Sequence, residues 1–426
     1  MRAVAEETSP AVRRGFILLA IMTAAFGMAM AAQQNIGTNY FEDVLKLKGP
    51  QFGYITAIRE VPGFLLIFIT AVFYRLSIPK LTALALVLLA VGYMLFGAST
   101  SFWTVAPWVV ISSMGYHTVL QTQYALGLSL TTENKSGSIL GTMSAINFGG
   151  GLAAMILVLL AFHYHVVSYR PTFVIAGVLA FVASIAVFSF PNLRDGEEVA
   201  RHTKREKFVV RKPYRLFYYL SLLDGARQQI FFSFGLWVLV NHYGLDVPKI
   251  SGLLIAVNLV AMLSGRRIGR MIDAYGEKRI LGVINIAYIV ALGGYALVQS
   301  VYFAGLCYAI YTFIMPLSSV GSATYLRKVA ASDDIAPSLA MGVSLQHAAA
   351  IVVPITTGFI LNFVGYQVPF LIACVFAFMA VIVTRRLDPV MQKAPKRIAE
   401  DEARASLRNT PISMEGETSG LAVTGK

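Results

Sequence analysis

The feature that most constrains this sequence is a succession of apolar segments, each about as long as a helix that crosses a bilayer. A membrane helix takes roughly 20 mostly apolar residues, and the 426-residue chain offers twelve such spans. The first set comprises Gly15–Gln34, Phe52–Arg75, Leu81–Ala98, Phe102–Leu126, Ile139–Phe162 and Thr172–Phe190. The second set comprises Phe217–Val240, Ile250–Ser264, Ile280–Val298, Tyr302–Tyr325, Leu339–Phe363 and Val368–Thr384.

The composition supports this interpretation. Hydrophobic residues make up 57% of the chain and charged residues only 13%, whereas soluble domains carry about 25% charged residues. A chain surrounded by hydrocarbon needs apolar side chains on its outside as well as in its core. We therefore predict an all-α integral membrane protein, with no room for a large soluble domain.

The positive charges predict the orientation of the spans. The net charge is +13, and 29 of the 35 Lys and Arg residues fall at the two termini and in the loops on their side of the membrane. The opposite side holds only Lys46, Lys48, Arg170 and Lys249. Short basic loops stay in the cytoplasm, so both termini are predicted to be cytoplasmic. Topology explains the positive charge, and a nucleic-acid partner is not indicated.

The chain divides into two six-helix halves. The halves are residues 15–190 and 216–386, separated by a basic cytoplasmic linker at 191–215. Residues 1–14 form a cytoplasmic N-terminus, and 387–426 a cytoplasmic tail expected to be largely disordered. The segment that begins at Tyr169 aligns with the one at Tyr366, matching at seven of fourteen positions. Such parallel duplication is typical of carriers that bind their solute between the halves.

A charged, glycine-containing loop follows the eighth span. It reads Gly269-Arg-Met-Ile-Asp273-Ala-Tyr-Gly276-Glu-Lys278-Arg279. This loop resembles the signature of the major facilitator superfamily, in which a carboxylate beside basic residues forms a charge lock between the moving halves. The copy that the family usually carries between spans two and three has decayed, because Arg75 occupies the acidic position.

The resemblance covers the architecture from about Gly15 to Thr384 and implies a secondary transporter. It also implies that spans four and seven line a central cavity, and that the loop residues Gly269, Asp273, Gly276, Lys278 and Arg279 form a gate. A simple solvated loop charge is the alternative for Asp273.

Ionisable residues within a span are costly and are functional candidates by default. In span seven, Asp224 and Arg227 lie three residues apart on one helix face, with Gln228 beside them. Arg227 is predicted to bind a substrate carboxylate or phosphate, with Asp224 taking up a proton. The alternative is a self-contained ion pair that serves packing.

Span two carries Arg59 and Glu60, neighbours that point about 100° apart around a helix. We expect one of them to serve the substrate site and the other to anchor a neighbouring helix. Glu60 is the second candidate for proton coupling. For Arg59, structural pairing and substrate binding are equally supported by the sequence.

Further polar residues complete the predicted cavity. His117, Gln121 and Tyr124 form one polar stripe along span four. Other candidate substrate-binding residues are Gln346, His347, Asn258 and Asn147. The pair His163 and His165 at the outer end of span five offers only two nitrogens, so no metal site is predicted.

Taken together, these features predict proton-coupled symport of a small anion by alternating access. The alternative is a proton-driven exporter or antiporter of a cation, metal or amphipathic compound. A third hypothesis is a non-transporting sensor or scaffold on the same fold. No nucleotide loop or catalytic constellation is found, so an enzyme is not predicted. We expect no cofactor, a monomer in the lipid bilayer, and a multi-pass location in the plasma membrane, in bacteria the inner membrane. Its partners are a small-molecule substrate and protons.

Overall fold

The computed structural model describes residues 9–65, 76–131, 136–191 and 211–409, and within these ranges every regular element is a helix. The N-terminal helices are α1 (Pro10–Asp43), α2 (Gly49–Phe64), α4 (Ile78–Phe96), α5 (Phe102–Leu128), α6 (Ser136–His163) and α7 (Tyr169–Phe188). The C-terminal helices are the short η3 (Lys212–Tyr214), α9 (Arg215–Asn241), α10 (Val247–Tyr275), α11 (Glu277–Leu297), α12 (Val301–Val329), α13 (Ser332–Val364), α14 (Gln367–Arg385) and α15 (Pro395–Asn409). The predicted all-helical class is thereby confirmed.

Seven of the described helices are long and apolar enough to cross a membrane, namely α1, α4, α6, α7, α11, α13 and α14. Helices α10 and α12 carry shorter apolar stretches. Each predicted span overlaps one long helix, although the second part of span two, with Arg75, lies outside the described residues. Helix α9 carries Asp224 and Arg227, and such charged groups lower its hydropathy. Twelve membrane crossings remain a prediction.

Local sequence signals explain where several helices begin. The Ser9 side chain accepts a hydrogen bond from the Val12 backbone nitrogen at the start of α1, as an N-cap residue does. Ser101 and Thr104 form a reciprocal capping pair at the start of α5. Between α10 and α11 the chain turns at Gly276 with φ of +77°, a conformation that glycine adopts without steric cost.

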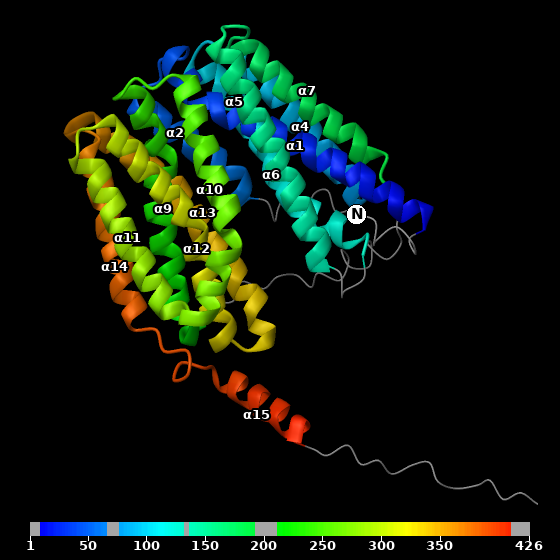
Figure 1. The fold of residues 1–426 in the computed structure, drawn as a ribbon, viewed down its shortest axis with the longest axis vertical. Helices are drawn as coiled ribbons and strands as arrows, with labels where there is room; N and C mark the ends of the chain where they lie inside the picture. Colours follow the sequence, from blue (N-terminus) through cyan, green and yellow to red (C-terminus); the bar gives the residue numbers. More distant parts are fainter. Residues whose placement is uncertain (1–8, 66–75, 132–135, 192–210, 410–426) are drawn as a thin grey trace, which may run out of the picture.

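The helices pack as two bundles. In the N-terminal half, α1 packs against α6 and α7, and α4 against α5 and α7. In the C-terminal half, α11 packs against α12 and α14, and α9 against α13 and α14. The halves meet mainly through α2 with α13 and α6 with α10, and Figure 1 shows these helices side by side.

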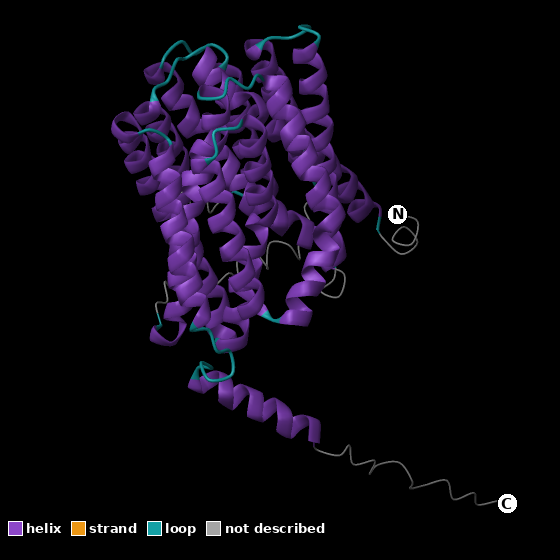
Figure 2. Cartoon of the chain, turned by 60° about the vertical axis from the view of Figure 1, so that its left-hand side comes forward, coloured by secondary structure: helices purple, strands orange, loops and turns teal. Residues whose placement is uncertain are grey.

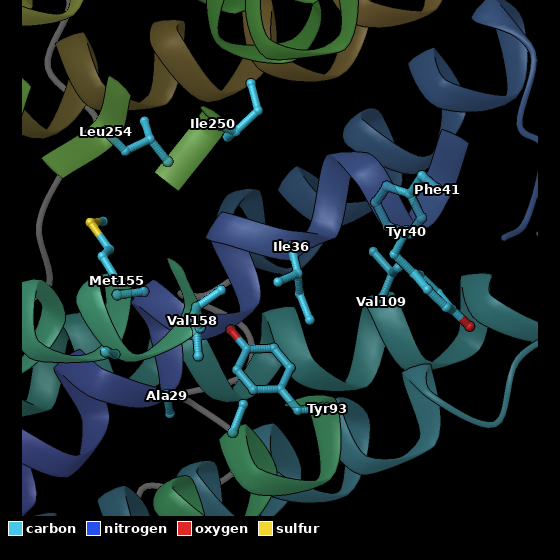
Figure 3. Packing of buried hydrophobic residues seen from close by; sticks show 14 of the residues in the cluster. Ala29, Ile36, Tyr40, Phe41, Tyr93, Val109, Met155, Val158, Ile250 and Leu254 are labelled. Carbon is cyan, nitrogen blue, oxygen red and sulfur yellow. The ribbon is translucent and has the colours of Figure 1, made fainter. Parts of the chain in front are cut away.

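One apolar cluster continues from the first half into the second. Figure 3 shows Ile250 and Leu254 of α10 beside Met155 and Val158 of α6, and all four side chains are buried. Small residues bring α2 and α13 still closer, because a Cβ atom on Gly53 would collide with the Pro354 backbone carbonyl. Such close approach of helices is typical of small-residue interfaces in membranes.

Polar contacts between the halves gather at one end of the molecule. Asn39 donates to the Leu245 carbonyl at 2.9 Å, and Asn241 donates to Glu42 at 2.6 Å. Ser251 donates to the Asn35 side chain at 3.0 Å. In Figure 1 the ribbons of α6 and α10 are close together at this end. They move apart toward the opposite end, where α1 begins. Hydrogen bonds therefore join the two halves at this end.

The tail differs from the expectation of a largely disordered segment. Pro395–Asn409 form the helix α15, which lies below the bundle in Figure 2, while residues 410–426 lie outside the described part. Lys396 pairs with Asp333 at 2.7 Å, and Glu400 accepts from the Ser332 side chain at 2.8 Å. The hydrogen bonds from Ser332 lower the pKa of the Glu400 carboxyl. These contacts attach α15 to the start of α13.

Candidate functional site

The carboxylate of Glu60 lies between the two halves and uses its two oxygens differently. Oε1 accepts from Arg59 Nη2 at 3.2 Å and from Arg59 Nε at 3.3 Å. Oε2 faces two imidazole rings, at 3.9 Å from His117 Nε2 and 3.4 Å from His347 Nδ1. His117 belongs to α5 in the same half, whereas His347 belongs to α13 in the other. One carboxylate thus contacts titratable groups from both halves.

Contacts with Ser113 fix the His117 ring. His117 Nδ1 lies 3.0 Å from both the Ser113 carbonyl oxygen and the Ser113 hydroxyl. The hydroxyl donates its hydrogen to the Arg59 carbonyl, so both atoms that face Nδ1 are acceptors. Nδ1 must therefore carry the proton, which leaves Nε2 as the nitrogen that faces Glu60.

Two further features shape the space around the three side chains, which we call the Glu60 cluster (Glu60, His117 and His347). The imidazole rings approach to 5.6 Å between centroids in an edge-on, T-shaped arrangement. Gly63, one turn after Glu60, leaves room for His117, because a Cβ atom there would lie 2.6 Å from the ring. The reactive atoms of the cluster all lie within 4.8 Å of one another.

Arg59 forms the open side of this cluster. Its side chain is 41% exposed, against 12% for Glu60, and its guanidinium lies 5.9 Å from the centre of the Phe232 ring on α9. The two neighbours were expected to point in different directions. They meet because the long Arg59 side chain turns back to the carboxylate, so both belong to one site.

The second predicted charge pair lies elsewhere, inside the C-terminal half. Arg227 is 1% exposed and donates from Nη2 to Asp224 Oδ1 at 2.8 Å. The other Asp224 oxygen accepts from Ser318 of α12 at 2.5 Å. The guanidinium lies 3.3 Å from the centre of the Tyr288 ring and 5.7 Å from that of Tyr311, an arrangement that stabilises a buried cation.

All of these partners come from the C-terminal half, and the structure does not bring Arg227 to the Glu60 cluster. They are the contacts expected of the self-contained ion pair. Among the described residues, Arg227 Nε and Nη1 have no hydrogen-bond partner, so the cation relies on Asp224 and the two tyrosine rings.

The remaining predicted residues are dispersed. Gln121 and Tyr124 are exposed, unlike His117 on the same stripe, and Gln228 and Gln346 are half-buried. Asn258 donates to the Leu254 carbonyl at 2.8 Å and contacts Met155 Sδ across the interface at 3.8 Å. Asn147 donates to the Thr23 carbonyl within its own half. Of the predicted site residues that the structure describes, contacts join Glu60 with Arg59, His117 and His347 in one group, and Asp224 with Arg227 in another.

The predicted gating loop is mostly helical, because α10 continues to Tyr275 and α11 begins at Glu277. Gly269 and Asp273 lie near the end of α10, in a stretch whose side chains are outside the described part of the structure. Gly276 forms the turn, and the Arg279 guanidinium lies 5.6 Å from the centre of the Tyr275 ring. Lys278 follows in the first turn of α11.

Several residues that shape these sites were not identified from the sequence. Ser113 lies four residues before His117 and hence on the same helix face. This spacing could have predicted their contact from the sequence. Gly63, Tyr288, Tyr311 and Ser318 carry no such signal, because their importance arises from packing between separate helices.

The sequence model of the Major Facilitator Superfamily matches residues 15–343 and 268–416. The chain belongs to the Major Facilitator Superfamily. It is accordingly a multi-pass membrane transporter and not an enzyme. This agrees with the resemblance carried by the loop from Gly269 to Arg279, even though no curated protein matches the sequence.

Solved structures show the same fold for this superfamily member. The nucleoside transporter NupG aligns with a TM-score of 0.71 at 15% identity, covering 88% of this chain and 98% of its own. A bacterial homologue of the human lysosomal transporter Spinster, in an inward-facing and occupied conformation, gives 0.69 at 13% identity, covering 91% and 100%. A D-xylose-proton symporter gives 0.67 at 13%, covering 90% and 100%.

Proposed function

We propose that this transporter couples the movement of a small anion to protons, and that the Glu60 cluster is its coupling site. The observation that carries the proposal is the contact of one carboxylate with His117 of its own half and His347 of the other half. Alternating access moves the two halves against each other. A proton that enters this cluster therefore changes the attraction between the parts that move.

The charges of the cluster favour an anionic solute. Arg59 and Glu60 balance each other when both histidines are neutral, and protonation of the histidines leaves a net positive site. The exposed Arg59 side chain is then available to a carboxylate or phosphate group, for which a guanidinium offers two parallel hydrogen bonds. Proton uptake and anion binding thus reinforce each other, as symport requires.

The membrane arrangement forms part of the proposal. We assign twelve crossings in two halves (15–190 and 216–386), a cytoplasmic linker at 191–215, and both termini in the cytoplasm. With this orientation the contacts of Asn39 and Asn241 close the outer side, and the described state faces inward. The loop from Gly269 to Arg279 then acts as a cytoplasmic gate. We infer a monomer in a plasma membrane, in bacteria the inner membrane.

Arg227 and Asp224 receive a structural part in this proposal. Their partners all belong to one half, so rocking of the halves does not alter their surroundings. Arg59 takes the anion-binding role that was predicted for Arg227, and Glu60 takes the proton-coupling role that was predicted for both Glu60 and Asp224.

A cation or metal is the second candidate solute, with proton-driven export as the mechanism. The observation that favours it is the convergence of one carboxylate oxygen and two imidazole nitrogens within 4.8 Å. These are the ligand types that borderline metal cations prefer. An amphipathic compound has no comparable support in the contacts of the cluster.

A transport assay in proteoliposomes tests the coupling. Thermal-shift screening of the purified protein against organic acids, phosphates, amines and divalent metals first identifies a solute, since a bound solute raises the melting temperature. With that solute, Glu60→Gln is expected to retain exchange across the membrane and to lose accumulation driven by a pH gradient. Asp224→Asn is the matched control. Normal accumulation by Glu60→Gln, or its loss only in Asp224→Asn, would overturn the assignment.

A further inference from the structure

The Glu60 cluster has an electrostatic problem that points to a bound cation. His117 Nδ1 carries the ring proton, because it faces the Ser113 carbonyl and a hydroxyl whose hydrogen is already donated. In the neutral ring, His117 Nε2 then presents a lone pair to Glu60 Oε2. Two acceptors that face each other in a buried site repel, and a cation bound between them removes that repulsion.

We propose that Glu60, His117 and His347 bind one divalent transition-metal ion of the Zn²⁺ type between the two halves. The proposal deepens the second candidate function, since it names the cation class, but the binding site itself does not depend on whether the metal is transported. A second proton on His117 is the competing positive species, so metal and proton occupy the same place in turn.

The distances between the ligand atoms suit such an ion. Bonds of about 2.0–2.1 Å in a tetrahedral arrangement place neighbouring ligand atoms about 3.3 Å apart. Glu60 Oε2 lies 3.4 Å from His347 Nδ1 and 3.9 Å from His117 Nε2. All three ligand atoms lie within 4.8 Å of one another, so metal binding requires the two imidazole rings to rotate toward the ion. Three protein ligands leave the fourth position open to water or to an exchanging ligand.

The surroundings of the ligands resemble those of built metal sites. Histidine ligands almost always donate their second ring N–H to a carbonyl or carboxylate, which fixes the tautomer. His117 does this with Ser113. Arg59 binds only the Oε1 atom of Glu60, so the carboxylate is oriented while Oε2 stays directed at the histidines. Gly63 supplies the space for the ring.

Arg59 opposes the metal electrostatically and so provides a sharp test. Its positive charge next to Glu60 lowers the affinity for a divalent cation, and its side chain is 41% exposed. Arg59→Gln is expected to bind Zn²⁺ several-fold more tightly. The same change weakens the binding of an anion, so metal and anion sites respond in opposite directions.

The experiment is a Co²⁺ titration of the full-length protein, purified in detergent without a polyhistidine tag. A bound tetrahedral Co²⁺ gives intense visible absorption, which Zn²⁺ then displaces. We expect one site per chain, with the affinity lowered about tenfold or more in both His117→Ala and His347→Ala, since even changes behind a ligand cost 10–100-fold. Removing His163 and His165, which are exposed, is the control and should leave this site intact.

The outcomes separate this proposal from the proposed transport. Melting temperatures without metal show that each variant folds, and Glu60→Gln adds a ligand variant of nearly unchanged shape. Unaltered Co²⁺ absorption in both His117→Ala and His347→Ala, or absorption lost only with His163 and His165, would overturn the metal site. Proton-driven anion accumulation is measured separately, so it can succeed while the metal site fails, and the reverse.

Discussion

Two groups of charges lie within the helices of this transporter, and they are built in opposite ways. Asp224 and Arg227 lie three residues apart on α9, and all their partners belong to the C-terminal half. The Glu60 cluster joins α2 and α5 to α13 of the other half. Arg227 is fully enclosed at 1% exposure, whereas Arg59 beside Glu60 remains 41% exposed.

The difference teaches where a conformational cycle can be coupled to charge. A pair enclosed in one half keeps its partners while the halves rock, so it contributes the same energy to every state. A cluster shared by both halves has different partners in each state, and a ligand or proton can shift the balance only through such a difference. Among ionisable residues within the membrane, those with partners in both halves are therefore the better candidates for coupling.

The largest effect is expected from breaking the enclosed pair. Arg227→Ala leaves Asp224 as a buried carboxylate whose one remaining partner among the described residues is Ser318, and removal of one member of a buried pair costs about 3–5 kcal/mol. Denaturant unfolding in detergent should show this loss. In the double variant Asp224→Leu/Arg227→Met, most of the stability should return, because no unpaired charge remains.

Arg59→Met is the matched change in the other region. Its pair with Glu60 is partly exposed, and such pairs contribute about 0–1 kcal/mol, so stability should change little while transport changes strongly. A large loss of stability in Arg59→Met with normal transport would reverse the comparison between the two regions.

The next effect concerns glycines at matched contacts. A Cβ atom on Gly53 would collide with the Pro354 carbonyl of the other half, and one on Gly115 would collide with the Ala85 carbonyl of the same half. Overpacking costs about 1–3 kcal/mol. Gly53→Ala should therefore shift the population toward states in which α2 and α13 separate, whereas Gly115→Ala should lower stability in all states alike.

Distances between spin labels on the two halves measure this difference. The distribution should broaden or shift in Gly53→Ala and stay unchanged in Gly115→Ala, while the melting temperature of Gly115→Ala falls. A population shift in both variants would show that the N-terminal half does not move as a unit.

The sequence predicted the helices well, because hydropathy and basic loops report directly on what each segment contacts. It also named Glu60, His117 and His347 individually, since each is a polar residue in an apolar span. Their meeting at Glu60 Oε2 was not predictable, because it depends on how α5 and α13 pack against α2.

The same limit explains why Arg227 was predicted to bind substrate, whereas the structure places it in an ion pair within one half. From the sequence, a guanidinium near the middle of span seven favours a substrate site. Whether it faces the other half or its own depends on Tyr288 and Tyr311, which approach from α11 and α12. Helix α15 was missed for another reason: its Arg397 pairs with Asp401 at a spacing of four residues, a charge pattern visible in the sequence, but its composition is mostly polar.

The smallest effect is expected where the charges face water. Ser332 holds Glu400 of α15, and these hydrogen bonds lower the pKa of the carboxyl. A lowered pKa in the docked state means that the contact is fully present above the usual pKa of a glutamate and is lost as the pH falls through the lowered value. A spin label on Glu402→Cys, in a background with Cys307 and Cys374 replaced by serine, should become more mobile as the pH falls below the usual pKa of a glutamate. Glu400→Gln removes one titrating group, so its label should show a smaller transition, since Asp333 still pairs with Lys396, and added salt should mobilise α15 by screening that exposed pair. Because Asp224 and Arg227 are shielded from water, the same salt should leave the stability of the enclosed pair unchanged, and an equal response at both places would show that burial does not separate them.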